Sequence, residues 1–315
     1  MTSPKNITLI IHGGSGRVHK EPMTVEKEAA YTQKLTEALL SGFDVLQKGE
    51  SSLDAVETAV KILEDSPLFN AGRGAVFNND EIIELDASIM DGKSMKAGAI
   101  AGVKTIKNPV SAARCVMEKS DYVMLSGLGA EQFAAENNLE IADSSWFETD
   151  ERRRQIQQIK QAKNSPDTNS LSDQSKYGTV GAVALDSEGN LAAATSTGGM
   201  LNKKYGRIGD TPIIGAGTYA NATCAVSCTG WGEFFICHTV ARDIAALVEY
   251  KQLSVAEAAD EVIFDKVAQA GGFGGVIVLD ANGNIAIKHN TEGMFWACIK
   301  WTGEKKVNVC NMIIE

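Results

Sequence analysis

The sequence predicts an α+β protein in which antiparallel sheets are covered by helices, and two kinds of pattern support this. Two pairs of apolar, strand-like segments flank short turns, at residues 187–190 and 281–283, and each pair is typical of a β-hairpin. Elsewhere apolar residues recur at the spacing of helices that bury one face. Apolar residues make up 44% of the 315 residues, so we expect one large core and a single domain spanning 1–315.

The first half of the chain begins with a short strand and continues with helices. Ile7–Ile11 is a continuous apolar run, which predicts a buried strand. Apolar side chains at helical spacing predict one helix around 31–46 and a second that opens at Ser51 or Ser52 and reaches Leu63. Short strands and turns are expected over 75–103, and another helix over 109–119.

The amino-acid composition of the chain changes near its middle. From about residue 150 to 177 the sequence is charged and polar, with almost nothing to bury, which predicts a mobile linker. Beyond it lie the two hairpins, 178–197 and 275–290. Between the hairpins we expect a buried helix over 234–248 and a second helix that opens with a capping box of Ser254 and Glu257.

Charge and composition exclude several classes of protein. The net charge of −10 opposes binding to phosphate backbones, so nucleic acid is not an expected partner. No apolar run is long enough to span a membrane or form a secretion signal, and the six cysteines are too sparse for a disulfide scaffold. We therefore expect a cytoplasmic protein that does not bind membranes. P-loop, dinucleotide-binding, zinc-protease and serine-hydrolase motifs are absent.

The segment Gly178-Thr179-Val180-Gly181 stands where the polar linker meets a strand. Taken alone, Thr179 is most simply a residue that begins a β-strand, which threonine favours. The neighbouring motifs change this interpretation. The chain resembles the plant-type asparaginases, or isoaspartyl peptidase/L-asparaginases, of the N-terminal-nucleophile hydrolase superfamily. The resemblance covers nearly the whole chain, and its most specific motifs are PLFNAGRGAVF (67–77), ELDASIMDG (84–92), GTVGAVALD (178–186), ATSTGGM (194–200), GRIGDTPIIGAG (206–217) and SCTGWGE (227–233).

The resemblance implies a four-layer αββα sandwich and a self-cleaving precursor. Cleavage before Thr179 yields an α subunit of 1–178 and a β subunit of 179–315, and two such pairs are expected to form an (αβ)₂ assembly. The implied reactions are hydrolysis of L-asparagine to aspartate and ammonia, and of β-aspartyl dipeptides to aspartate and an amino acid. No catalytic cofactor is implied.

The chemistry suits the residues at this junction. A threonine hydroxyl is a weak nucleophile, and cleavage after Gly178 creates a base beside it, because the new α-amine of Thr179 has a reference pKa of about 7.7–8. By resemblance, Thr197 is the second threonine that contacts the nucleophile, and Thr229 with Gly230 forms the oxyanion hole. Trp231 stands where some relatives carry a small polar residue, which leaves the leaving-group preference open.

Further residues are assigned roles by the same resemblance. Arg207 and Asp210 match residues that bind the α-carboxylate and the α-ammonium of the substrate, although a surface ion pair between them is the structural alternative. Asn70 and the loop of Gly13 and Gly14 match positions that support self-processing. A structural sodium ion is implied at backbone carbonyls of Leu63, Glu64, Ser66, Phe69, Ala71 and Arg73.

Two alternative functions stay open at this point. A glycosylasparaginase is a relative with similar chemistry, but Asp rather than Gly178 typically precedes its nucleophile. A small-ligand binding module without catalysis would use the glycine-rich loops alone, and its chain would stay intact.

Overall fold

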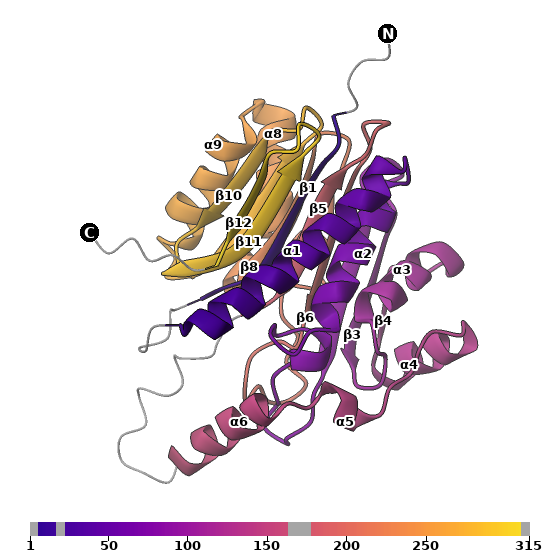
Figure 1. Ribbon diagram of the computed structural model, residues 1–315, viewed down its shortest axis with the longest axis vertical. Coiled ribbons are helices and arrows are strands. Elements are labelled where there is room, and N and C mark those ends of the chain that lie inside the picture. Colours follow the sequence, from indigo (N-terminus) through magenta and orange to yellow (C-terminus); the bar gives the residue numbers. More distant parts are fainter. Residues whose placement is uncertain (1–5, 17–22, 163–177, 310–315) are drawn as a thin grey trace.

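Two stacked β-sheets lie between two layers of helices (Figure 1). The computed structural model describes residues 6–16, 23–162 and 178–309. Strands of the two sheets face each other, with β5 and β6 against β8 and with β1 against β9. The predicted αββα sandwich is therefore confirmed, and its deepest part is the space between the sheets.

The larger sheet has the strand order β12-β11-β1-β5-β6-β2-β3-β4. Its pairs are antiparallel except β3 with β4. The predicted hairpin at 187–190 joins β5 to β6 at its centre. In chain order the strands are β1 (Thr8–Gly16), β2 (Leu85–Asp91), β3 (Ala97–Val103), β4 (Met124–Ser126), β5 (Val180–Leu185), β6 (Leu191–Thr197), β11 (Gly293–Lys300) and β12 (Lys305–Asn308).

The smaller sheet has the strand order β10-β9-β8-β7 and is antiparallel throughout. The second predicted hairpin forms its β9 and β10. The strands are β7 (Thr218–Ala220), β8 (Cys224–Gly230), β9 (Gly274–Asp280) and β10 (Ile285–His289).

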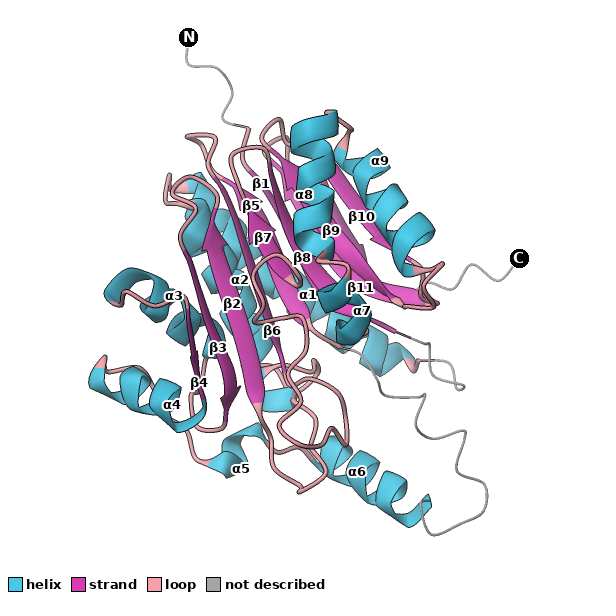
Figure 2. Cartoon of the chain, turned by 180° about the vertical axis from the view of Figure 1, so that it is seen from behind, coloured by secondary structure: helices cyan, strands magenta, loops and turns pink. Residues whose placement is uncertain are grey.

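Helices cover the outer face of each sheet (Figures 1 and 2). On the larger sheet these are α1 (Val25–Gln47), α2 (Ser52–Glu64) and α3 (Pro109–Lys119), and on the smaller sheet α8 (Val240–Lys251) and α9 (Val255–Asp260). A π-helical stretch, Glu261–Val267, continues α9. The remaining short elements are η1 (Gly72–Gly74), α4 (Gly127–Glu136), α5 (Ser144–Phe147), α6 (Asp150–Ala162) and α7 (Gly232–Cys237).

Local sequence signals set several helix boundaries. Ser51 caps α2 and forms a capping box with Asp54. The predicted box of Ser254 and Glu257 opens α9. Pro109 occupies the first turn of α3, where its missing N–H costs no hydrogen bond.

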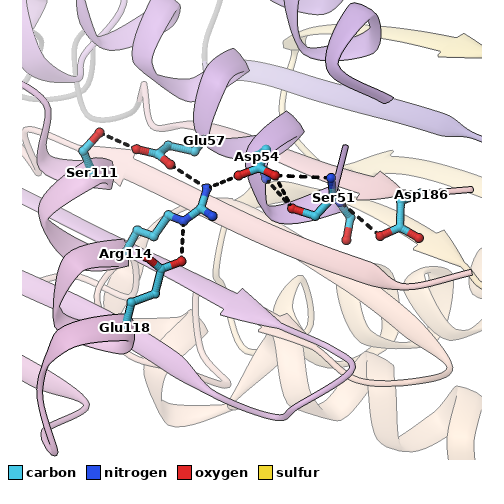
Figure 3. A network of polar contacts seen from close by, with 8 residues as sticks. Ser51, Asp54, Glu57, Ser111, Arg114, Glu118 and Asp186 are labelled. Atoms are coloured by element: carbon cyan, nitrogen blue, oxygen red, sulfur yellow. Dashed lines mark hydrogen bonds and ion pairs between the residues drawn. The ribbon is translucent and has the colours of Figure 1, made fainter. Parts of the chain in front are cut away.

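An ion-pair network joins α2 to α3 (Figure 3). Arg114 on α3 reaches Asp54 at 2.6 Å and Glu57 at 2.8 Å, both on α2, and also Glu118 at 2.7 Å. The carboxylate of Asp186, which follows β5, accepts from the backbone N–H at the start of α2 at 3.1 Å. These contacts fix α2 against the strand that follows the candidate nucleophile.

Two sequence predictions need correction. The helix predicted over 234–248 is interrupted, because Thr239 takes a left-handed conformation with φ of 46° between α7 and α8. The linker predicted from about residue 150 begins with the helix α6, whose Ile156 is fully buried. Arg152 of α6 also donates to the Gly74 carbonyl at 2.7 Å. The rest of that predicted linker, 163–177, lies outside the described residues.

Candidate active site

Thr179 lies immediately before β5, buried between the two sheets with 7% of its surface exposed. Its hydroxyl donates to the hydroxyl of Thr197, at the end of the neighbouring strand β6, over 3.1 Å. The Thr197 hydroxyl also accepts from the Gly199 N–H at 3.0 Å. The structure thus brings together the two threonines that the sequence paired.

The peptide bond between Gly178 and Thr179 is closely packed by two other segments. A Cβ atom at Gly14 would lie 2.7 Å from Gly178 Cα and 3.3 Å from Thr179 N, and Gly14 has φ of +106°. Only glycine fits there, for both reasons. On the other side, a Cβ at Gly178 would lie 3.0 Å from Asn70 Cβ. At Gly13, a Cβ would approach the ring of Phe69 to 2.5 Å.

Asn70 ties the loop after α2 to the turn after β6. Its side-chain N–H donates to the Gly199 carbonyl at 2.7 Å, and its side-chain oxygen accepts from the Val76 N–H at 3.0 Å. The Gly198 N–H donates to the Asn70 carbonyl at 3.0 Å. Asn70 therefore positions the turn that follows Thr197.

The predicted oxyanion-hole residues lie at the end of β8 in the opposite sheet. The Thr229 hydroxyl accepts from the Ser15 N–H at 3.2 Å, and the Ser15 hydroxyl donates to the Thr229 carbonyl at 3.1 Å. Since that hydroxyl acts as an acceptor, this bond leaves its own proton available for donation. Gly230 packs tightly, because a Cβ there would lie 2.6 Å from the Phe273 carbonyl oxygen. Trp231, the next residue, packs edge-to-face on Phe234 with ring centroids 5.1 Å apart.

Arg207 and Asp210 lie beside the start of α7, just beyond Gly230. They do not form the alternative ion pair with each other. Arg207 instead donates twice to Glu233, from Nε at 2.9 Å and from Nη2 at 2.8 Å. This pairing with Arg207 lowers the pKa of the Glu233 carboxyl. A Cβ at Gly232 would contact both Arg207 Nη2, at 2.6 Å, and Asp210 N, at 3.0 Å.

The Asp210 carboxyl is buried, and its Oδ2 atom has no hydrogen-bond partner among the described residues. Burial raises its pKa to about 7, against a weaker opposing effect of the nearby Arg207. A buried carboxylate oxygen without a donor is unfavourable unless a ligand supplies one. The site therefore offers an acceptor for a cationic group.

The loop proposed to hold sodium folds back on itself at the end of α2. A Cβ atom at Gly72 would lie 2.4 Å from the Glu64 carbonyl oxygen, and one at Gly74 would lie 2.2 Å from the Phe69 carbonyl oxygen. These carbonyls therefore lie against a tight turn in which only glycine fits at both positions. The side chain of Arg73 stacks on Trp146 at 4.8 Å. Within the described residues, no group of three or more histidine, cysteine and acidic side chains is placed to hold a metal ion.

Sequence reasoning missed three residues beside the site: His12, Ser15 and Glu233. His12 is 167 positions from Thr179 along the chain, yet its Nδ1 lies 3.1 Å from the Thr179 carbonyl oxygen. Burial lowers the pKa of His12 to about 3, so the ring is neutral at physiological pH. His12 contacts the carbonyl of Thr179, whereas the Thr179 hydroxyl bonds to Thr197. The only signal for these residues was their membership of motifs, His12 and Ser15 in HGGSG (12–16) and Glu233 in SCTGWGE (227–233).

A buried threonine behind a glycine, at the start of a central strand of an αββα sandwich, places the chain among hydrolases of the N-terminal-nucleophile class. A family model described as Asparaginase matches residues 5–309. The chain therefore belongs to this asparaginase family. No helix in the described part of the chain has the length and apolar character to cross a membrane.

Relatives from three groups of organisms match over nearly their whole lengths. The isoaspartyl peptidase of Escherichia coli K12 is 50% identical over 293 residues, which cover 92% of this chain and 91% of the relative. The isoaspartyl peptidase/L-asparaginase of Xenopus laevis is 42% identical, covering 93% and 92%. The plant-type L-asparaginase of Pyrococcus abyssi is also 42% identical, covering 93% and 96%.

Proposed function

We propose that this chain cleaves itself between Gly178 and Thr179 and then hydrolyses L-asparagine and β-aspartyl dipeptides with the freed threonine. The contact between the buried hydroxyls of Thr179 and Thr197 carries the proposal, because it orients one weak nucleophile inside a closed site. The names of the relatives in E. coli, X. laevis and P. abyssi support these substrates.

The chemistry requires few groups. The α-amine of Thr179 accepts the hydroxyl proton as the oxygen attacks the side-chain carbonyl of the substrate. Thr229 and Gly230 donate to the oxygen that becomes negative. The proton then passes to the departing nitrogen, which leaves as ammonia or as the amine of an amino acid. Water hydrolyses the remaining ester and releases aspartate.

A direct assay separates this proposal from the alternatives. Purified protein is incubated with L-asparagine, a β-aspartyl dipeptide and an N-glycosylated asparagine, and released aspartate is measured. We expect turnover of the first two. Turnover of the glycosylated substrate alone would favour a glycosylasparaginase, although Gly178 opposes that assignment. Binding without turnover, by an intact chain, would favour a binding module.

Substitution of Arg207 is expected to act mainly on substrate binding. Arg207→Ala removes the partner of the α-carboxylate, so KM should rise about 100-fold while kcat falls far less, in line with the loss of a charge-assisted bond. Steady-state kinetics with L-asparagine measure both constants. Arg207→Lys is the control, because lysine keeps the positive charge but lacks the planar guanidinium that binds a carboxylate through two hydrogen bonds. Self-cleavage should survive, and an uncut Arg207→Ala chain would instead indicate a structural role.

Asp210 is expected to make ligand affinity depend on pH. Its pKa of about 7 means that the carboxyl is largely protonated at pH 6, and an α-ammonium prefers the ionised form. The inhibition constant of L-aspartate should therefore fall as pH rises from 6 to 8. Asp210→Asn, which cannot ionise, should bind L-aspartate weakly at every pH in that range. An equally steep dependence in Asp210→Asn would remove Asp210 from this role.

A sodium ion in the loop of residues 63–73 is part of the same proposal. Leu63, Glu64, Ser66, Phe69, Ala71 and Arg73 would hold it through backbone carbonyls, and it would stiffen the loop that carries Asn70. The melting temperature of the protein should then be higher in sodium chloride than in lithium or tetramethylammonium chloride at equal ionic strength. Equal melting temperatures in all three salts would argue against the ion.

We also propose an (αβ)₂ assembly in the cytoplasm. The five described cysteines, Cys115, Cys224, Cys228, Cys237 and Cys298, are free thiols, as expected for a reducing compartment. Light scattering of the purified protein should give twice the mass of the chain, and cell fractionation tests the compartment.

A further inference from the structure

A continuous row of polar side chains crosses the space between the two sheets, in the layer of side chains next to the candidate active site. On the larger sheet, His12, Gly181, Thr195 and Ser88 are register partners across the four adjacent strands β1, β5, β6 and β2. On the smaller sheet, Thr218 and Ser227 are register partners on β7 and β8. We call these six residues the polar row, and its five side chains beyond Gly181 are fully buried.

The side chains of the polar row form an unbroken chain of hydrogen-bond contacts between the sheets. The Ser227 hydroxyl lies 2.9 Å from His12 Nε2 and 2.7 Å from the Thr195 hydroxyl. Thr195 contacts Thr218 at 2.5 Å, and Thr218 contacts Ser88 at 2.8 Å.

The contacts of the polar row end at two backbone carbonyls. One belongs to Thr179, the candidate nucleophile, and the other to Thr211, the residue after Asp210. At one end, His12 Nδ1 contacts the Thr179 carbonyl at 3.1 Å. At the other, the Ser88 hydroxyl oxygen lies 2.6 Å from the Thr211 carbonyl oxygen, and its single proton is donated either to this carbonyl or to Thr218.

Position along the strands ties the polar row to the site. Gly181 lies two residues after Thr179, Thr195 lies two before Thr197, and Ser227 lies two before Thr229. Side chains two apart on a strand point to the same face, so the polar row is the layer adjacent to the site. The next row of the larger sheet, Ile10, Val183, Ala193 and Met90, is apolar.

The absence of a side chain at Gly181 makes room for the polar contacts. A Cβ at Gly181 would lie 2.0 Å from the Ser227 hydroxyl and 2.4 Å from His12 Nε2. The Thr179 carbonyl can only accept, so Nδ1 of His12 carries the proton. Because the buried ring is neutral, its Nε2 then accepts from Ser227. These roles fix both the tautomer and the orientation of His12.

The candidate site draws its parts from both sheets, with Thr179 and Thr197 on the larger and Thr229 and Gly230 on the smaller. Apolar packing between sheets is not directional, whereas hydrogen bonds require defined distances and angles. We propose that the polar row sets the spacing and register of the two sheets at the site, and that Thr195, Ser227 and His12 are positioning residues for the nucleophile and the oxyanion donors. This proposal rests on the proposed function.

A matched pair of variants tests the proposal. Thr195→Val keeps the shape of the side chain but removes the hydroxyl, whereas Thr195→Ser keeps the hydroxyl and loses a methyl group. Misplacement of reacting groups lowers rate more than affinity, so Thr195→Val should reduce kcat and the self-cleavage rate about tenfold or more, with KM nearly unchanged. Thr195→Ser should restore both rates to within about threefold of wild type.

The measurements are kcat and KM for L-asparagine, the self-cleavage rate and the melting temperature. A Thr195→Val protein that melts earlier but retains wild-type kcat and self-cleavage would overturn the positioning role. So would a Thr195→Ser protein as slow as Thr195→Val. If Thr195→Val does not fold, Thr218→Val and Thr218→Ser provide the same comparison from the other sheet. A wild-type protein that is itself uncut and inactive would instead overturn the proposed function on which this inference depends.

Discussion

Thr179→Ala is expected to leave the chain uncut and to abolish hydrolysis of L-asparagine. Both reactions use the same hydroxyl, and the nearest alternative, Thr197, lies on the neighbouring strand without an α-amine to accept its proton. Loss of a covalent nucleophile typically costs several orders of magnitude in kcat. Denaturing electrophoresis and an aspartate-release assay measure the two effects.

Thr179→Ser is the matched control, since it retains a hydroxyl and, after cleavage, an α-amine. We expect it to cleave itself and to turn over substrate at a reduced rate. A Thr179→Ala protein that hydrolyses L-asparagine at a measurable fraction of the wild-type rate would show that the nucleophile is misassigned.

Thr229→Val is expected to lower kcat about 10²- to 10³-fold, the usual cost of one oxyanion-hole donor. Valine preserves the shape of the side chain, and KM should change little because negative charge develops only in the transition state. The Ser15 N–H, which donates to Thr229 at 3.2 Å, also loses its acceptor, so some loss of stability is expected.

Thr229→Ser separates these effects, because it keeps the hydroxyl that both contacts use. Its kcat should remain within about tenfold of wild type. A rise in KM with unchanged kcat in Thr229→Val would place Thr229 in substrate binding rather than in transition-state stabilisation.

Much of the fold follows from local signals in the sequence. The hairpins joining β5 to β6 and β9 to β10 are marked by glycine-containing turns between apolar strands, and Ser51 and Ser254 mark helix starts. The break at Thr239 carries no such mark, because a β-branched residue rarely adopts positive φ. Only the surrounding structure makes that conformation favourable.

The helix α6 shows a second limit of sequence reasoning. Its charged sequence holds two isoleucines, of which only Ile156 is fully buried, and its other contacts come from distant segments. Arg153 pairs with Glu81 at 3.1 Å, and Arg152 reaches the Gly74 carbonyl. Tertiary contacts of this kind leave no periodic pattern in the helix itself.

Sequence motifs predicted part of the candidate site. Contacts between strands that are far apart in the sequence were not predicted. Thr179, Thr197 and Thr229 stand in long motifs, and in the fold the hydroxyls of Thr179 and Thr197 are in contact. The pairing of His12 with Ser227 joins residues 215 positions apart. The buried, unpartnered oxygen of Asp210 is likewise a property of the packed fold. Such relations arise from sheet register, which a single sequence does not encode locally.

Intact-mass measurement with N-terminal sequencing of the purified protein tests self-cleavage most directly. The protein is kept at neutral pH without added protease, and Thr179→Ala is processed in parallel as the uncut reference. We expect the wild type to give two chains, one of which begins at Thr179, and the variant to give one. A wild-type protein that remains a single chain, or whose new N-terminus is any residue other than Thr179, would contradict the account.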